Sequence, residues 1–142
     1  MLANELMTQS VECIAPDSSL QNASRKMKSL DVGFLPICEK DRLVGTLTDR
    51  DIVLRVIAEG KNPKDCTARE VMSTEVYWCY DDQTAEDVAH YMAQKAIRRL
   101  LVLNRQKRLV GVISIGDLAK NGEPEGAGET IRNIAEAPSE AA

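Results

Sequence analysis

Two segments of the sequence place a hydroxyl side chain three positions before an aspartate, at the end of an apolar run. They are Thr48 with Asp51 and Ser114 with Asp117. Such a pair can cap a helix, because the hydroxyl accepts from a backbone N–H and the carboxylate complements the positive helix end. It can also bind a nucleotide, because free N–H groups suit phosphate and an aspartate accepts from both neighbouring hydroxyls of a ribose. The residues alone leave both interpretations open.

Arg98 and Arg99 add a second group suited to phosphate. A guanidinium presents a planar fork of donors, which matches phosphate better than a lysine does. On a chain of net charge −4, the same residues could instead line a solvated strand edge or pair with surface carboxylates. The corresponding positions near the other segment hold Gly33 and Phe34. The two segments therefore differ in the positive charge that they offer a phosphate.

Other reactive groups predict neither catalysis nor a metal site. The chain has no P-loop or HExxH pattern. The carboxylate pair of Asp49 and Asp51 has no counterpart beside Asp117, because Ile115 stands two positions before it. Its four cysteines are too far apart for a CxxC motif. Cys13 and Cys38 are the candidate pair to meet on neighbouring strands; the alternative is four ordinary thiols in a reducing compartment.

Three of the five aromatic side chains stand together at residues 77–80, Tyr-Trp-Cys-Tyr. Trp and Tyr are enriched at interfaces, so these residues are interpreted as packing between repeats or protomers. Stacking on a base is the alternative. The single histidine, His90, falls on a helix face and is expected to face solvent.

The composition is that of an ordinary soluble domain. With 142 residues, 44% of them apolar and 28% charged, the chain can bury a real core. It has no basic tract for a nucleic-acid backbone, no run near the ~20 apolar residues of a membrane span, and no signal-peptide pattern in its first residues. We expect a cytoplasmic protein with neither nucleic acid nor membrane as a partner.

The sequence also repeats itself. Leu-Val-Gly at 43–45 returns 66 positions later at 109–111, and Ala-Asn-Glu-Leu-Met-Thr at 3–8 is matched 65 positions later by Ala-Arg-Glu-Val-Met-Ser at 68–73. A one-residue insertion in the polar turn near 107–108 explains the change of offset, and hairpin loops tolerate such insertions. Self-similarity at a fixed period indicates a duplicated unit.

Two copies are predicted, at 1–60 and 66–122. The rest of the chain, 123–142, is predicted to begin with a flexible linker at 123–128 and to continue as a tail in which 129–137 fits a short helix. Apolar periodicity in each copy indicates strand, helix, strand, strand, helix, an α+β (α/β) fold. One such unit is too small to bury its sheet face alone. The two copies should therefore pack through their sheets with pseudo-twofold symmetry, around one shared core, and leave two equivalent clefts. The later strands and closing helices are expected at 32–38, 43–48 and 51–59, and at 97–103, 108–114 and 117–120.

These motifs resemble a known family. The residues Met-Thr at 7–8, Gly-Phe-Leu-Pro-Ile at 33–37 and the segment 43–52 resemble the cystathionine-β-synthase (CBS) domain, and the second copy, with 97–102 and 111–118, resembles its partner. A tandem pair of this kind resembles the Bateman module. In that family the module often binds adenine nucleotides or adenosyl compounds as a regulatory sensor, and many members form dimers.

The resemblance implies roles for particular residues. Asp51 and Asp117 would hold ribose hydroxyls, with Thr48 and Ser114 near ribose or phosphate. In the family, the residues that open one repeat tend to line the cleft that the other repeat's aspartate completes. The implied groupings are Thr8, Val11, Ser114 and Asp117, with Arg98 and Arg99 at the phosphate, and Ser73, Val76, Thr48 and Asp51. Because the first copy has Gly33 and Phe34 where the family often carries basic phosphate contacts, the resemblance implies that the better nucleotide site lies beside Asp117.

Together these features predict a stand-alone regulatory module that binds an adenine nucleotide (AMP, ADP or ATP) in the clefts between the repeats and signals by a change of conformation or assembly. It is predicted to be no enzyme, to hold no metal, to form a homodimer and to regulate an unidentified protein partner. The alternatives are a dimeric interaction scaffold with no nucleotide ligand, or a module that binds NAD or S-adenosylmethionine.

Overall fold

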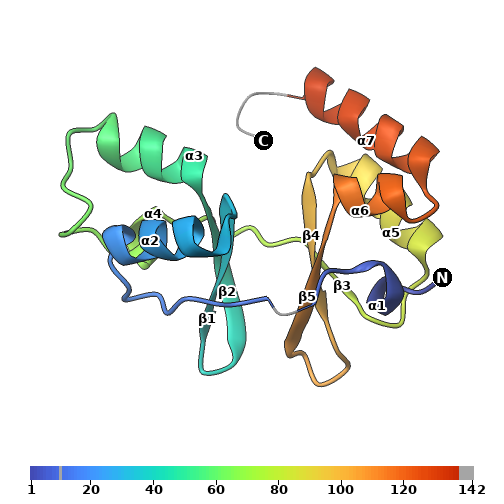
Figure 1. The fold of residues 1–142 in the computed structure, drawn as a ribbon, viewed down its shortest axis with the longest axis horizontal. Coiled ribbons are helices and arrows are strands. Elements are labelled where there is room, and N and C mark those ends of the chain that lie inside the picture. Colours follow the sequence, from blue (N-terminus) through green and yellow to red (C-terminus); the bar gives the residue numbers. More distant parts are fainter. Residues whose placement is uncertain (10, 138–142) are drawn as a thin grey trace. The chain divides into compact units, whose positions relative to one another are not determined.

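The computed structural model describes residues 1–9 and 11–137 and divides into two compact units. Unit 1 comprises residues 1–11 and 77–142, and unit 2 comprises residues 12–76 (Figure 1). The first residues of each repeat thus belong to the same unit as the body of the other repeat. Residues 138–142, part of the expected tail, lie outside the described residues.

Unit 2 is built on a two-stranded antiparallel sheet. The strands are β1 (Phe34–Glu39) and β2 (Arg42–Thr48), and Ile14 adds a single parallel bridge to Ile37 of β1. The strand expected to open the first repeat is therefore reduced to a bridge. The expected helix 51–59 begins earlier and passes into a π-helix. The helices are α2 (Leu20–Leu30), α3 (Asp49–Ile52), the π-helix η1 (Val53–Ile57) and α4 (Ala68–Val71).

Unit 1 contains a three-stranded sheet of order β3-β4-β5. β3 (Trp78–Tyr80) runs parallel to β4 (Arg99–Leu103), which pairs antiparallel with β5 (Leu109–Ser114). The helices are α1 (Ala3–Leu6), α5 (Ala85–Lys95), α6 (Ile115–Lys120) and α7 (Pro124–Glu136).

The helices α2 and α5 begin and end alike. The hydroxyls of Ser19 and Thr84 each accept from the backbone N–H three residues on, both at 3.1 Å, and so cap the first turn. Each helix ends at a residue in the left-handed conformation, Asp31 with φ 55° and Ala96 with φ 54°. Such a residue stops the helix and turns the chain toward the following strand.

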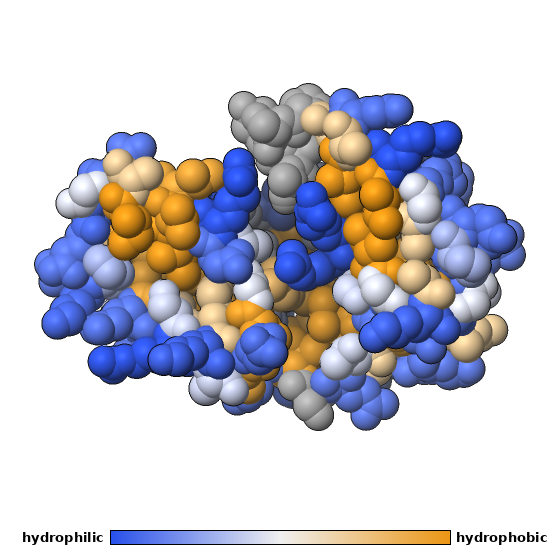
Figure 2. Space-filling view, turned by 45° about the horizontal axis from the view of Figure 1, so that its top comes forward, coloured by the Kyte–Doolittle hydropathy of each residue, from blue (hydrophilic) through white to orange (hydrophobic). Residues whose placement is uncertain are grey.

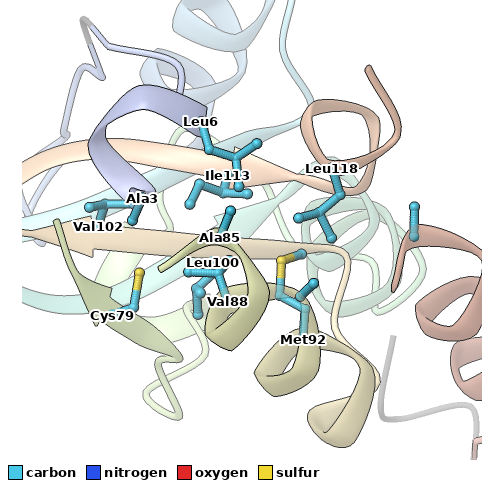
Figure 3. Close-up of a cluster of buried hydrophobic side chains, with 12 residues drawn as sticks. Ala3, Leu6, Cys79, Ala85, Val88, Met92, Leu100, Val102, Ile113 and Leu118 are labelled. Carbon is cyan, nitrogen blue, oxygen red and sulfur yellow. The ribbon is translucent and has the colours of Figure 1, made fainter. Parts of the chain in front are cut away.

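Each unit buries its own apolar cluster. In unit 1, side chains from α1, α5, α6 and the sheet meet around Leu100 and Ile113, both fully buried (Figure 3). In unit 2, Leu35 and Leu47 occupy the equivalent positions. The mixture of helices and short strands confirms the predicted α+β class. Each cluster includes a helix from the start of the other repeat, since Ala3 and Leu6 of α1 belong to the cluster of unit 1 and Ala68 and Val71 of α4 belong to that of unit 2. The shared core between the repeats stays a prediction.

The helix α7 packs on α5 and α6 within unit 1. Thr130 is fully buried on its inner face, and Asn133 Nδ2 donates to the carbonyl of Ala93 in α5 at 2.6 Å. Gly126 permits the close approach, since a Cβ at this position would lie only 2.8 Å from the Cβ of Ala89.

This helix corrects the prediction of a flexible linker at 123–128. Gly126 and Gly128 are poor helix formers, which led to that expectation, but Pro124 stands in the first helical turn, where proline is tolerated. Packing against α5 and α6 outweighs the low intrinsic helix propensity, and packing is a contribution that the local sequence does not reveal.

Candidate functional site

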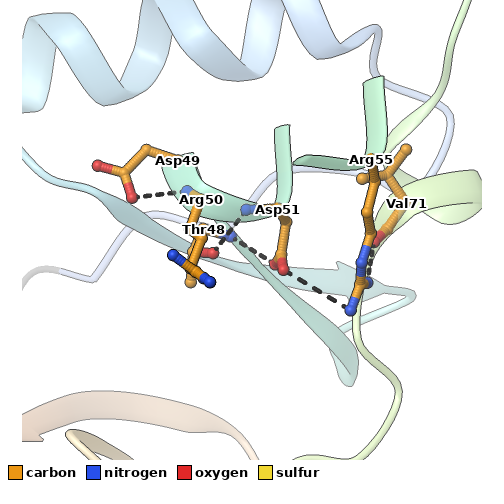
Figure 4. Close-up of polar contacts among 6 residues, drawn as sticks. All are labelled: Thr48, Asp49, Arg50, Asp51, Arg55 and Val71. Atoms are coloured by element: carbon orange, nitrogen blue, oxygen red, sulfur yellow. Dashed lines mark hydrogen bonds and ion pairs between the residues drawn. The ribbon is translucent and has the colours of Figure 1, made fainter. Parts of the chain in front are cut away.

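The junction between β2 and α3 holds a reciprocal cap. The N–H of Thr48 donates to Asp51 Oδ2 at 3.0 Å, and the N–H of Asp51 donates to Thr48 Oγ1 at 3.1 Å (Figure 4). The Asp51 side chain is 17% exposed. Because strand and helix both anchor the pair, the carboxylate is held in one orientation.

The junction between β5 and α6 repeats this geometry. The N–H of Ser114 donates to Asp117 Oδ2 at 2.9 Å, and the N–H of Asp117 donates to Ser114 Oγ at 3.1 Å. The capping interpretation therefore holds at both junctions. The cap leaves each carboxylate able to accept further hydrogen bonds, since an ionised carboxylate has about four lone-pair sites and the cap uses one oxygen.

The two aspartates differ in their charged neighbours. In unit 2, Arg55 lies 3.8 Å from Asp51 Oδ1 and donates to the carbonyl of Val71 at 2.7 Å (Figure 4). The equivalent of Arg55 in unit 1 is Asn121, and no ion pair to Asp117 occurs in the part of the chain that the structure describes. Among the described residues, an ion pair thus occurs at the Asp51 carboxylate and not at the Asp117 carboxylate.

The first residues of each repeat lie beside the strand that leads to the other repeat's aspartate. Thr8 pairs with Val112 through two backbone hydrogen bonds of 2.9 and 3.1 Å, two positions before the capping serine. Ser73 pairs with Thr46 at 2.9 and 3.0 Å, two positions before the capping threonine. This placement is the one that the family resemblance implies for Thr8 and Ser73. Their role toward a ligand stays a prediction.

Gly111 and Gly45 make these backbone pairings possible, because neither has a side chain that would clash with the paired segment. A Cβ at Gly45 would lie 2.6 Å from Met72 Sδ. At Gly111 it would overlap Met7 Sδ and lie 3.0 Å from the carbonyl oxygen of Thr8. Glycine recurs at both positions because a neighbouring backbone approaches closely, and this explains the repeated Leu-Val-Gly segment.

Arg98 and Arg99 lie next to the start of α6. Arg99 is the register partner of Ser114 across β4 and β5, and the carbonyl of Arg98 accepts from the N–H of Ile115 at 3.1 Å. The side chain of Arg98 is exposed and that of Arg99 is half-buried. The backbone thus brings both arginines to the Asp117 junction. The other two predicted site residues, both half-buried, are Val11 in unit 1 and Val76 in unit 2.

The aromatic segment 77–80 packs within unit 1. Tyr77 lies against the apolar cluster, and the rings of Trp78 and Tyr80 meet edge to face with centroids 5.0 Å apart. The guanidinium of Arg105 lies 3.9 Å from the centre of the Tyr80 ring. All of these contacts lie within unit 1, so the predicted packing between repeats or protomers stays a prediction, as does base stacking.

A groove that the sequence analysis did not predict lies in unit 2, between α2 and the start of η1. Its volume is about 490 Å³, and it contains none of the predicted site residues. In unit 1, the residues equivalent to Ser24 and Lys28 of this groove are Ala89 and Ala93, which α7 contacts. The sequence does not reveal this groove, because its lining residues come from separate segments that meet only in the folded chain. In the structure it is marked by exposed apolar side chains, among them Val32 and Val53. Among its lining residues are Met27, Lys28, Val32, Asp49, Ile52 and Val53.

Neither a metal-binding cluster nor a membrane-spanning helix occurs among the described residues. His90 is exposed, as predicted. Across residues 1–9 and 11–137, no group of three or more His, Cys, Asp or Glu side chains is arranged to hold a metal ion. Within those same residues, every helix is too short or too polar to cross a membrane.

The four cysteines fall into two kinds. The Sγ atoms of Cys13 and Cys38 lie 2.7 Å apart, so the pair expected to meet does meet. Cys66 and Cys79 are buried, and burial raises the pKa of the Cys79 thiol to about 12.

Comparison with known proteins identifies the class that this duplicated fold defines. A family model for the CBS domain matches residues 3–58 and 68–123. These two ranges make up most of the chain. The chain belongs to the CBS-domain family, which confirms the resemblance drawn from its motifs.

Individual relatives share this architecture. The chain is 40% identical over 131 residues to the CBS domain-containing protein YhcV of Bacillus subtilis (strain 168), covering 92% of each chain. It resembles the crystal structure of Hypoxic Response Protein I with two coordinated zinc ions, with 34% identity, a TM-score of 0.75 and coverage of 85% of this chain and 98% of that one. It also resembles CBSX2 in complex with AMP, with a TM-score of 0.71, coverage of 84% and 93%, and 21% identity, a likeness of fold alone.

Proposed function

We propose that the protein is a regulatory module that binds an adenine nucleotide at the Asp117 junction of unit 1, and more weakly at the Asp51 junction of unit 2. The observation that carries the proposal is the pairing of Thr8 with β5, the strand that ends at Ser114, three residues before Asp117. The CBS resemblance implies this ligand class for residues so arranged, and the AMP complex of CBSX2 supports it at the level of the fold.

The junction is suited to a ribose before any ligand arrives. Asp117 Oδ2 accepts from the N–H of Ser114, so the cap fixes the carboxylate and leaves Oδ1 to accept from ribose hydroxyls. The hydroxyl of Ser114 accepts from the N–H of Asp117 and keeps its own proton for donation. Arg98 and Arg99 supply positive charge for a phosphate, which a neutral nucleoside would not use.

An interaction scaffold without a ligand is the second candidate. It is favoured by the two reciprocal caps, which account for both aspartates without any bound molecule. NAD and S-adenosylmethionine also carry an adenosine ribose, so the same carboxylate would hold them. These ligands differ from AMP, ADP and ATP in the group that would face the two arginines, because neither carries a terminal phosphate.

A thermal-shift panel separates these candidates. We expect AMP, ADP or ATP to raise the melting temperature of the full chain, because a ligand that binds only the native state stabilises it by RT ln(1 + [L]/Kd), about 2.7 kcal/mol at 100 times Kd. Adenosine is the control for the phosphate contact and should give a smaller shift. A panel without any shift, NAD and S-adenosylmethionine included, would support the scaffold instead.

The nucleotide is proposed as a signal and not as a substrate, and we propose no catalytic step. A ligand can shift a conformational equilibrium only by its difference in affinity for the two states. The regulated partner would be a separate protein in the cytoplasm that recognises one of those states.

We propose that the assembly is a homodimer formed through the groove of unit 2. Exposed apolar residues line it, with Val32 43% and Val53 54% exposed, and Figure 2 shows apolar surface on this unit. In unit 1, α7 covers the equivalent helices. The groove is also lined by Lys28 and Asp49, so two copies related by a twofold axis can pair opposite charges across it.

Val53→Glu tests this interface. We expect the dimer to dissociate, with a Kd raised on the order of 100-fold, because an unpaired buried carboxylate costs several kcal/mol. Light scattering after size exclusion measures the mass. Ile131→Glu is the matched control, since Ile131 is 55% exposed on α7, and it should leave the dimer intact. A dimer that survives Val53→Glu, or that Ile131→Glu disrupts, would rule out the groove as the interface.

A further inference from the structure

The sulfur atoms of Cys13 and Cys38 form a close pair in unit 2. They lie 2.7 Å apart and both residues are half-buried, so a small reagent can reach them. An S–S bond is about 2.05 Å long, and movement of less than about 1 Å would join the two atoms. Cys66 and Cys79 are buried in different clusters, one in each unit.

The backbone holds the pair in place. The N–H of Ile14 donates to the carbonyl of Pro36 at 3.1 Å, and the N–H of Cys38 donates to the carbonyl of Ile14 at 3.0 Å. Ile14 and its bridge partner Ile37 are both buried. Residues 13 and 38 are therefore neighbours because of sheet pairing and core packing, and their proximity does not depend on a bond between the sulfurs.

The two thiols differ in character. The hydrogen bond with Cys38 lowers the pKa of Cys13, although burial opposes this effect. The same hydrogen bond, followed by burial, raises the pKa of Cys38. Cys13 thus has more thiolate at neutral pH and is the better nucleophile.

We propose that Cys13 and Cys38 are a dithiol site that a low-molecular-weight disulfide converts into an intramolecular disulfide. With glutathione disulfide as the reagent, the Cys13 thiolate attacks one sulfur, forms a mixed disulfide and releases one glutathione thiolate. Cys38 then loses its proton to solvent and attacks the Cys13 sulfur, releasing the second glutathione thiolate. Two protein thiols are oxidised, and one glutathione disulfide is reduced to two glutathiones.

The bond would fasten the segment around Ile14 to β1. It closes a loop between positions 25 residues apart in sequence, and it restricts the unfolded chain more than the folded one, in which the sulfurs already meet. The oxidised protein should therefore melt about 5–10 °C above the reduced protein. This inference does not depend on nucleotide binding.

The experiment equilibrates the full chain in glutathione buffers of increasing oxidised fraction, quenches with acid, and counts alkylated thiols by intact mass. We expect two of the four thiols to be lost together, and a non-reducing peptide map to join residues 13 and 38. Cys13→Ser and Cys38→Ser should each abolish the cross-link. Cys66→Ala is the matched control and should retain it.

Three results of this experiment would overturn the inference, and a fourth comes from the melting temperature. They are a lasting glutathione adduct on Cys13, disulfide-linked dimers on a non-reducing gel, or four alkylated thiols in the most oxidising buffer. A melting temperature that falls on oxidation would also contradict it, because the folded chain would then have to distort to accommodate the bond. The thermal measurement needs no variant, so it stands even if a substitution disturbs folding.

Discussion

Asp117→Ala is expected to remove most of the thermal stabilisation that an adenine nucleotide gives this protein. The substitution deletes the carboxylate that would accept from the ribose hydroxyls, and hydrogen bonds to a charged acceptor contribute about 1.5–3 kcal/mol each. We therefore expect the nucleotide Kd to rise on the order of 100-fold. Isothermal titration with the most effective nucleotide of the panel measures the change.

Asp51→Ala is the matched control for this prediction. It removes an equivalent capping bond, 3.0 Å long against 2.9 Å at Asp117, so both variants lose a similar amount of helix stability. Asp51 already has Arg55 beside it, and its unit lacks the arginine pair. We expect Asp51→Ala to reduce binding much less. Equal losses in the two variants would contradict the ranking of the sites, and no loss in either would contradict the proposed function.

Gly111→Ala is expected to lower the free energy of unfolding by about 1–3 kcal/mol, the usual cost of forcing an extra methyl group into a packed site. The new Cβ would overlap Met7 Sδ and lie 3.0 Å from the carbonyl oxygen of Thr8, so the N-terminal segment must move away from β5. Urea denaturation measures the loss. Because Thr8 belongs to the candidate site, nucleotide affinity should fall in the same variant.

Gly116→Ala is the control of identical chemistry. A Cβ at Gly116 meets only Ser114 Oγ, at an ordinary 3.5 Å, and alanine in a helix gains about 0.5–1 kcal/mol over glycine. This variant should be slightly more stable than the parent. Adding Met7→Ala to Gly111→Ala should restore part of the lost stability, since the Met7 side chain that the new Cβ overlaps is then removed. A Gly111→Ala protein as stable as the parent would show that the segment is not held as described.

Sequence patterns predicted the local parts of this structure well. The caps at Thr48 and Ser114 involve residues three positions apart, and the helices α2 and α5 follow from apolar residues at helical spacing. The failures are also specific. The first residues of α7 were predicted to be a linker. Gly126 and Gly128 lower the intrinsic helix propensity there, and Ala89, against which the helix packs, is remote in the sequence.

The features of the candidate site also fall into those that the sequence predicted and those that it did not. The hydroxyl and carboxylate pairs could be read from the residues, but only their family resemblance suggested that Thr8 belongs with Ser114. Arg55 beside Asp51, the groove of unit 2 and the reason for glycine at position 111 were not predicted. Each depends on a contact between segments that the chain brings together only after folding.

The sequence by itself determined the duplication, the α+β class and the two hydroxyl–aspartate pairs, because these follow from apolar periodicity and from residue types within one turn of chain. Only the tertiary structure decided that residues 1–11 complete the unit that contains residues 77–142, that α7 covers its helices, and how closely Cys13 and Cys38 approach. The physical reason is that burial and pairing between distant segments are properties of the packed chain, and local propensity does not encode them.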